Sequence, residues 1–212
     1  YARCGPSSII YSMGITQHSH GVDNIFALAN LAMMTGNIGK PSSGINPLRG
    51  QNNVQGSCDM GALPNLLPAY QAINNDELRG KFEKAWGGAP LPDKPGLTVV
   101  EIMNAAGTGE IRAMYIMGEN PAVSDPDIRH VIEALKSLDF LVVQDIFLSE
   151  TAALAHVVLP ATSSLEKDGT FTNTERRVQR IRKASKPVGE SRPDWMIISN
   201  LAARMGYSEQ FC

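Results

Sequence analysis

The sequence predicts an α/β fold, a parallel β-sheet with helices on both faces. Helix and strand signals alternate through the second half of the chain, as in consecutive βαβ units. The chain has 212 residues, 43% of them hydrophobic, which is enough to bury a sizeable core. Thr98 and Glu101 have the spacing of a capping box, and Pro126 suits a first helical turn. The expected elements of this half are helices at 76–86, 98–107, 126–138, 149–155 and 193–205 and strands at 113–117, 140–143 and 156–159.

The first half of the chain is expected to contain fewer regular elements. A short buried strand at 8–13 is followed by a polar turn at 14–21 and an amphipathic helix at 22–34, which Gly36 ends. Residues 35–75 show little periodicity and are rich in Gly, Pro, Asn and Ser. A loop of that length in a compact domain is typically functional or connects two domains.

Composition excludes several classes of function. The formal net charge is −2 and the dense basic run is confined to 176–183, so we expect no nucleic-acid partner. The longest apolar stretch, 25–34, is too short to cross a bilayer, so no direct membrane insertion is expected. Three widely spaced cysteines exclude a disulfide framework and favour a reducing, cytoplasmic compartment. His18 and His20 lack a third nearby ligand, so no metal site is predicted.

The run Arg-Gly-Gln-Asn-Asn-Val-Gln-Gly at 49–56 places one basic side chain among amides and glycines. Glycine lets the backbone approach a ligand closely, amides supply paired donors and acceptors, and the guanidinium of Arg49 is a planar fork suited to a carboxylate or a phosphate. The run therefore predicts a loop that binds an anion or a heterocycle. The alternative is a solvated surface loop, which is common for runs rich in Asn and Gly.

Polar residues follow two of the predicted strands directly. Gly118, Glu119 and Asn120 come after the strand at 113–117, and Gln144 and Asp145 come after the next one. Ligands of parallel sheets bind beyond the carboxyl ends of the strands, and a carboxylate there suits a ribose diol or the N–H edge of guanine. The two acids predict a nucleotide site, although ordinary loop acids or helix caps are the alternative. The sequence has no G-x-G-x-x-G fingerprint and no P-loop, so an ordinary NAD or ATP site is not supported.

Four segments resemble the catalytic subunit of molybdenum- or tungsten-dependent formate dehydrogenases, in the molybdopterin oxidoreductase family. They are 31–41 (LAMMTGNIGKP), 49–56, 58–61 (CDMG) and 149–166 (SETAALAHVVLPATSSLE), with His156 where the family often has Asp. The resemblance implies two molybdopterin guanine dinucleotides, each bound by a Rossmann-like domain without the glycine fingerprint. It makes 1–50 the end of one dinucleotide-binding domain and 51–212 the main part of the second. The chain then matches an internal piece of a longer subunit, which suits its start at Tyr1.

The resemblance also implies roles for single residues. Arg49 matches a catalytic residue that holds the carboxylate of the substrate, and Gln51 matches a neighbouring cofactor contact. Thr162 matches a contact to a phosphate or the pterin. The guanosine end of one dinucleotide is assigned to Gly118, Glu119, Asn120, Ser124, Gln144 and Asp145. Met13 and Gln17 match contacts to the other dinucleotide, although core packing is the alternative for Met13.

The implied activity is oxidation of formate to carbon dioxide at a molybdenum or tungsten bis(molybdopterin guanine dinucleotide) centre. The chain has neither the metal ligand with its proton-handling His nor cysteines for a [4Fe-4S] cluster, so we expect these outside it and expect the isolated chain to be inactive. Electron-transfer subunits with iron-sulfur clusters are the implied partners. The alternatives are another member of the family, such as a nitrate reductase-like enzyme, and a cofactor-free structural subunit of a respiratory complex.

Overall fold

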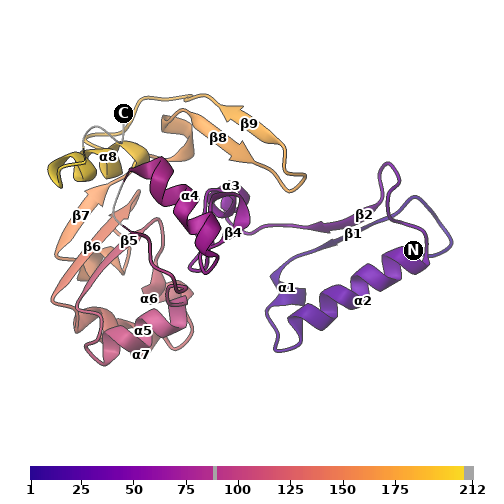
Figure 1. Ribbon diagram of the computed structural model, residues 1–212, viewed down its shortest axis with the longest axis horizontal. Coiled ribbons are helices and arrows are strands. Elements are labelled where there is room, and N and C mark those ends of the chain that lie inside the picture. Colours follow the sequence, from indigo (N-terminus) through magenta and orange to yellow (C-terminus); the bar gives the residue numbers. More distant parts are fainter. Residues whose placement is uncertain (88–89, 208–212) are drawn as a thin grey trace. The chain divides into compact units, whose positions relative to one another are not determined.

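The computed structural model describes residues 1–87 and 90–207 (Figure 1). Contacts divide the chain into two compact units. The first consists of Tyr1–Ala62 and Thr170–Gln179, and the second of Leu63–Gly169 and the segment from Arg180 onward. A compact unit need not coincide with a ligand-binding domain, so the assignment of 1–50 and 51–212 to two dinucleotide-binding domains stays a prediction.

The first unit is built around one βαβ motif. The strands β1 (Ser8–Tyr11) and β2 (Gly44–Pro47) pair in parallel, with Ser8 opposite Gly44 and Tyr11 opposite Pro47. They are joined through α2 (Gly21–Met34), which lies alongside them in Figure 1. The predicted helix is confirmed, whereas the strand predicted to be buried at 8–13 ends at Tyr11 and has no buried residue. Gly36 follows α2 with φ +67°, a conformation that glycine adopts without strain.

Two predictions for this region were wrong in part. The polar turn begins with a short helix, α1 (Met13–Thr16), and the irregular stretch 35–75 contains β2, α3 (Val54–Asp59) and shorter pieces. The shorter pieces are β3 (Leu66–Leu67), the 3-10 turn η1 (Pro68–Tyr70) and β4 (Gln71–Ala72). The sequence of β2 has no alternation of its own. Its hydrogen bonds to the distant β1 make it a strand.

The second unit contains the predicted parallel sheet. Its strands β5 (Ala113–Met117), β6 (Phe140–Asp145) and β7 (Val157–Pro160) pair in that order and in parallel. The α/β class with a parallel sheet is therefore confirmed. Because the strands are parallel, their carboxyl ends lie at one edge of the sheet.

A compact core lies between this sheet and the helices α5 (Val99–Gly107), α6 (Pro121–Ser124) and α7 (Ile128–Lys136). Leu141 and Val143 from β6 are 0% exposed and pack with Val131 and Leu135 of α7. Burial of each such side chain contributes about 1.5–3 kcal/mol. On the opposite face, Gln144 bonds to Asp194 at the start of α8 (Asp194–Arg204), so helices contact both faces.

The capping box of α5 is present as predicted, and α4 (Asp76–Trp86) spans the predicted residues. The helix predicted from Pro126 begins later, at Ile128. Asp127 has the left-handed φ of 56° and its carboxylate accepts a hydrogen bond from the His130 N–H, so it caps α7 instead of joining it.

The predicted helix at 149–155 is only a 3-10 turn, η2 (Ala152–Leu154), because the chain is already extended at Ala155 before β7. The strands β8 (Gly169–Thr172) and β9 (Val178–Ile181) were not predicted and form a two-stranded sheet, preceded by the 3-10 turn η3 (Ser164–Glu166). Among the described residues, no helix combines the length and apolarity needed to span a membrane.

Candidate functional site

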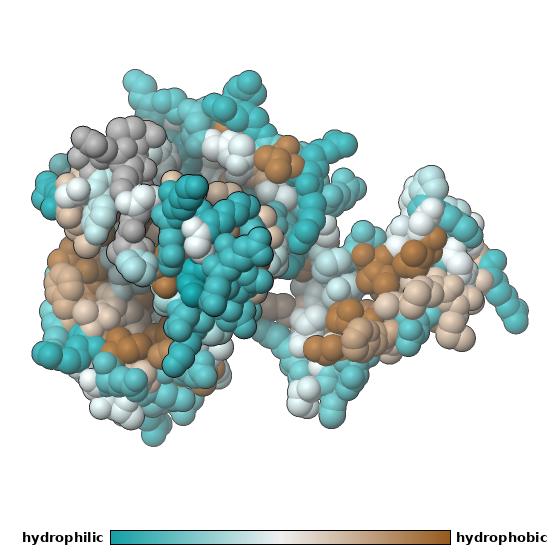
Figure 2. All heavy atoms as spheres, viewed as in Figure 1, coloured by the Kyte–Doolittle hydropathy of each residue, from teal (hydrophilic) through white to brown (hydrophobic). Residues whose placement is uncertain are grey.

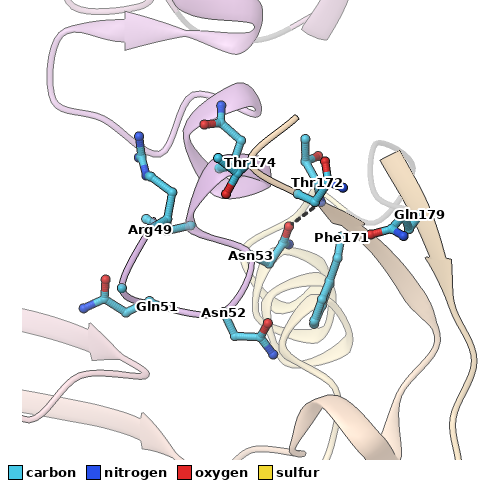
Figure 3. Close-up of a pocket in the computed structure, with 12 residues that line it drawn as sticks. Arg49, Gln51, Asn52, Asn53, Phe171, Thr172, Thr174 and Gln179 are labelled. Carbon is cyan, nitrogen blue, oxygen red and sulfur yellow. Dashed lines mark hydrogen bonds between the residues drawn. The ribbon is translucent and has the colours of Figure 1, made fainter. Parts of the chain in front are cut away.

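The loop that carries Arg49 lines a pocket of about 390 Å³ within the first unit (Figure 3). The loop leads from β2 to α3, and the opposite wall consists of β8, β9 and the turn that joins them. The lining residues are Arg49, Gly50, Gln51, Asn52, Asn53, Val54, Gln55, Phe171, Thr172, Asn173, Thr174 and Gln179. Among these described residues Arg49 is the only charged side chain. The pocket is therefore polar, with a single positive group.

Arg49 is exposed, and its guanidinium forms no ion pair with a carboxylate of the described residues. Its Nη2 donates to the sulfur of the buried Cys58 at 3.5 Å, a weak contact that orients the fork without neutralising it. In Figure 3, Arg49 and Gln51 lie on the side of the loop away from Phe171 and Gln179. Such a guanidinium is suited to binding a carboxylate through two parallel hydrogen bonds.

The helix α3 takes up part of the Arg-Gly-Gln-Asn-Asn-Val-Gln-Gly run, which was predicted to be neither helix nor strand. Val54, Gln55 and Gly56 form its first turn. Gln55 is buried and its amide nitrogen donates to Asp59 at 2.9 Å, one helical turn later. The irregular part of the run is thus limited to 49–53.

Met13 and Gln17 lie at the two ends of α1, directly after β1. Met13 is 48% exposed, so it packs in no core of the described residues and the core-packing alternative is not supported. Their predicted contacts to a dinucleotide stay predictions.

The carboxyl edge of the sheet brings several predicted residues together. Gly118 follows β5 with φ +67°, and its N–H donates to the Gln144 carbonyl of β6 at 2.8 Å. Asp145 ends β6 opposite Pro160 of β7, and Thr162 comes two positions later. The prediction that the polar residues after β5 and β6 gather at one edge is confirmed.

The two acids at this edge differ in their environments. Partial burial, reinforced by the nearby carboxylate of Asp125, raises the pKa of Glu119. Asp145 uses one carboxylate oxygen to accept from the N–H groups of Ile146 at 2.6 Å and Phe147 at 3.4 Å, while its other oxygen has no hydrogen-bond partner among the described residues. Both acids therefore keep acceptor capacity for a ligand.

The side-chain amide of Asn120 is already hydrogen-bonded to other residues of the protein. Its amide nitrogen donates to Glu150 at 2.7 Å, and its oxygen accepts from the N–H of Thr151 at 3.0 Å and from the Thr151 hydroxyl at 2.7 Å. Thr151, which is 0% exposed, accepts from the Ala122 N–H in turn. The hydrogen bond from Asn120 lowers the pKa of Glu150. This network fixes the loop after β5 against the segment after β6.

The side-chain amide of Gln144 is also hydrogen-bonded to other residues of the protein, on the other face of the sheet. It is 0% exposed, its oxygen accepts from the hydroxyl of Tyr115, and its nitrogen donates to Asp194 at 2.8 Å. Asp194 forms an ion pair with Lys167. Burial, with a further contribution from Asp194, raises the pKa of Tyr115. The chain of contacts attaches α8 to the sheet, and direct ligand contacts of Asn120 and Gln144 stay predictions.

Thr162 has a hydroxyl at this edge that could bind a ligand. Its residue is 2% exposed, and its hydroxyl is buried with no hydrogen-bond partner among the described residues. Leaving such a group unpaired costs about 1–3 kcal/mol, which a bound acceptor such as a phosphate or pterin oxygen removes. The residues at this edge thus fit a polar, nucleotide-like ligand. Ser124, at the end of α6, is exposed and donates to Asp125 at 3.2 Å.

Sequence reasoning missed the residues that hold the site residues in place: Thr151, Tyr115, Lys167, Asp194 and Asn53. Thr151 and Asn53 lie in quoted motifs, but neither motif indicated a positioning role. The departure at His156 is also explained, because its Nδ1 accepts from the Leu141 N–H at 2.9 Å. A carboxylate of Asp is an acceptor too, so either residue supports the start of β6.

Comparisons with known proteins identify related sequences. The family described as molybdopterin oxidoreductase matches residues 6–204. The F420-dependent formate dehydrogenase subunit alpha of Methanocaldococcus jannaschii is 60% identical over 100% of this chain and 31% of its own length. Formate dehydrogenase H of Escherichia coli is 48% identical over 98% of this chain and 29% of its own length. The chain thus spans less than a third of these relatives.

One solved structure is similar in fold. Acetylene hydratase from Pelobacter acetylenicus matches 70% of this chain and 18% of its own chain with a TM-score of 0.50. The identity is 22%, so the likeness concerns the fold alone.

Proposed function

This chain belongs to the molybdopterin oxidoreductase family, and on that premise we propose that it is the cofactor-binding and substrate-positioning segment of a formate dehydrogenase. The full-length protein oxidises formate to carbon dioxide at a molybdenum or tungsten centre held by bis-molybdopterin guanine dinucleotide. The names of the relatives from Methanocaldococcus jannaschii and Escherichia coli support the substrate. The observation that carries the proposal is the guanidinium of Arg49, which lies in a loop of amides and glycines and forms no ion pair with a carboxylate of the described residues.

Arg49 binds the substrate as an anion. Formate is a carboxylate, and a guanidinium matches its two oxygens with two parallel N–H donors. Binding through both oxygens fixes the direction of the single C–H bond, which is the bond that breaks. Orientation of this kind lowers the barrier because the reacting groups are held in a productive geometry before reaction.

Cofactor contacts are proposed within each unit separately. Gln51 and the residues Met13 and Gln17 contact it from the first unit. Thr162, Glu119 and Asp145 bind it from the sheet edge of the second unit, the two acids at guanosine and Thr162 at a phosphate or the pterin. When bound, the metal of the cofactor supplies the acceptor for the two electrons that formate loses with one proton. We keep the domains predicted from the sequence as part of this proposal. Residues 1–50 are the end of one dinucleotide-binding domain, and residues 51–212 are the main part of the second.

The electrons are proposed to leave through a [4Fe-4S] cluster and partner subunits with iron-sulfur clusters. The name of the Methanocaldococcus jannaschii relative, a subunit alpha, supports a multi-subunit enzyme. The chain provides no cluster of three or more metal-ligating side chains among the residues that the structure describes. We propose that the [4Fe-4S] cluster belongs to other segments of the full-length protein.

Substitution of Arg49 in the full-length enzyme tests the substrate assignment. With formate as donor and a viologen dye as acceptor, Arg49→Ala is expected to lower kcat/KM by about 10- to 150-fold, the effect of losing about 1.5–3 kcal/mol of charge-assisted bonding. Arg49→Lys keeps the positive charge but lacks the planar set of N–H donors. Its kcat/KM is therefore expected to lie between those of the parent and of Arg49→Ala. Arg112→Lys, at a surface ion pair with Asp139, is the matched control with unchanged kinetics. Unchanged kcat/KM in both Arg49 variants rejects the assignment.

The same preparations separate the alternatives. Turnover of nitrate with reduced viologen and none with formate would favour a nitrate reductase-like enzyme. Absence of bound metal and guanine would favour the cofactor-free structural subunit. Asp145→Ala is expected to lower the guanine and metal content of the purified enzyme, and content equal to that of the parent would reject the guanosine site.

A further inference from the structure

We infer that Asn53 is a positioning residue for the Arg49 loop, because its side-chain amide binds the backbone of β8 and thereby fixes where Arg49 and Gln51 stand. The inference rests on the proposed function and adds to it a residue that acts through the position of Arg49. All the contacts involved lie within the first unit.

The amide of Asn53 binds one edge of β8. Its oxygen accepts from the Thr172 N–H at 2.9 Å, drawn as the dashed line in Figure 3, and its nitrogen donates to the Thr170 carbonyl at 3.3 Å. A parallel neighbouring strand forms the same pair of bonds, to the carbonyl before and the N–H after one residue. The side chain therefore replaces a short piece of strand at that edge.

The backbone of Asn53 explains why this residue type is suitable. Its φ of 59° is left-handed, a conformation in which Asn is enriched among residues other than glycine. The left-handed residue ends the loop and begins α3, and its carbonyl accepts from the Ser57 N–H at 3.0 Å. One residue thus stops the loop, starts the helix and binds the neighbouring strand.

Gly56 is required for this arrangement. A Cβ at that position would lie 2.3 Å from the Asn53 side-chain oxygen, closer than real contacts allow. The side chain of Asn53 passes over the first turn of α3, and only glycine leaves space for it. Any larger residue at position 56 must displace the amide from β8.

The other end of the loop is also fixed. The Leu48 N–H donates to the Tyr11 carbonyl at the end of β1 at 2.8 Å, and the Leu48 carbonyl accepts from the Ser12 hydroxyl at 2.9 Å. Arg49 and Gln51 lie between this anchor and Asn53. A short segment held at both ends has little freedom, so release of Asn53 is expected to let the guanidinium move.

Asn53→Gly in the full-length enzyme is the direct test, since glycine keeps the left-handed backbone and removes the amide. We expect kcat/KM for formate to fall by about tenfold to 100-fold, the size of effect that small misplacements produce. Metal and guanine content should equal those of the parent. In an Arg49→Ala background the same change should cost little, because its effect acts through Arg49. An equal fold loss in both backgrounds, or no loss, overturns the inference.

Gly56→Ala tests the same contact from the other side. Its added methyl displaces the Asn53 amide, so we expect the kinetic loss of Asn53→Gly. The double variant Asn53→Gly/Gly56→Ala should match Asn53→Gly alone, because no side chain remains to be displaced. Gly80→Ala in α4, where an added Cβ meets nothing within 4 Å, is the matched control with unchanged kinetics. Additive losses in the double variant contradict the mechanism.

Hydrogen exchange separates this inference from the proposed function. The Thr172 amide, which donates to Asn53, is expected to exchange faster in Asn53→Gly than in the parent, with or without formate. An unchanged rate overturns the positioning role even in an enzyme that oxidises formate. A parent enzyme that does not oxidise formate rejects the proposed function, and the exchange rate still decides whether Asn53 holds the loop.

Discussion

The two predicted ligand-binding regions are stabilised in different ways. The sheet edge of the second unit is backed by a core in which Leu141, Val143 and Leu135 are at most 1% exposed. The Arg49 loop belongs to a unit whose long helix α2 buries only Gly21 and Ala32. Figure 2 shows apolar groups at the surface of that unit, and Phe26 and Met34 on α2 are 61% and 86% exposed. Regular strands position one region, and a few polar contacts position the other.

The position of a site residue can thus be fixed by a packed core or by individual hydrogen bonds. At the sheet edge, the end of each strand sets the place of Gly118 and Asp145 as long as the core is intact. In the loop, Arg49 depends on the anchors at Leu48 and Asn53. Core substitutions should therefore affect the sheet edge by lowering the stability of the second unit. Loop substitutions should affect the Arg49 loop by changing the position of its side chains.

The largest expected effect is a contrast in hydrogen exchange on the isolated chain. Backbone amides of 113–159 should be strongly protected because their strands and helices bury a common core. Amides of 1–50 should exchange fast, since α2 and the two-stranded sheet bury little apolar surface within this chain. Mass spectrometry of peptides from both ranges measures this. Equal slow exchange in the two ranges would remove the contrast.

Leu141→Ala is the next largest effect. It leaves a cavity under β6, and we expect a loss of about 2–5 kcal/mol of unfolding free energy for the second unit. Leu31→Ala in α2, where the parent residue is 44% exposed, is the comparison and should cost clearly less. Urea unfolding followed by far-UV circular dichroism measures both. Similar losses at the two positions would show that α2 is packed as well as the sheet.

Thr162→Val should be favourable for the stability of the isolated chain and unfavourable for cofactor binding in the full-length enzyme. In the isolated chain it removes a buried hydroxyl that has no partner among the described residues, so a gain of up to about 1–3 kcal/mol in stability is expected. In the full-length enzyme it removes a proposed contact, so lower cofactor content is expected. Urea unfolding and metal analysis test the two halves. A loss of stability in the isolated chain would show that the protein itself satisfies this hydroxyl.

The smallest effect concerns pH and Glu119. Burial raises the pKa of its carboxyl above the ordinary 4.5, so the folded state binds this proton more tightly than the unfolded chain. Stability from this group is present at low pH and is lost as the pH rises from about 4.5 through the raised pKa. Glu119→Gln should therefore be more stable than the parent at neutral pH and not below pH 4.5, by a small margin because solvent screens the site. Parallel pH profiles would contradict this.

Local signals in the sequence were sufficient for some of the regular elements of the second unit. The capping box at Thr98 depends on neighbours within a few residues and is present as predicted. β5 spans the predicted residues although only Ile116 in it is buried, and β6 runs two residues beyond the predicted strand, to Asp145. The grouping of Gly118 with Asp145 also follows from the sequence, since parallel strands end at one edge. The start of α7 was missed because Asp127 turns left-handed, a choice that Pro126 does not reveal.

The class of fold, the family resemblance and the two polar regions could be predicted from the sequence, because they depend on composition, periodicity and short motifs. Which polar groups are already hydrogen-bonded became visible only in the folded chain. Asn120 and Gln144 bond to partners far along the chain, whereas the Thr162 hydroxyl and the guanidinium of Arg49 keep capacity for a ligand. Hydrogen bonds between distant residues depend on how the chain folds back on itself, and no local pattern encodes that distance. The role inferred for Asn53 came from the same source, a contact with β8 across more than half of the chain.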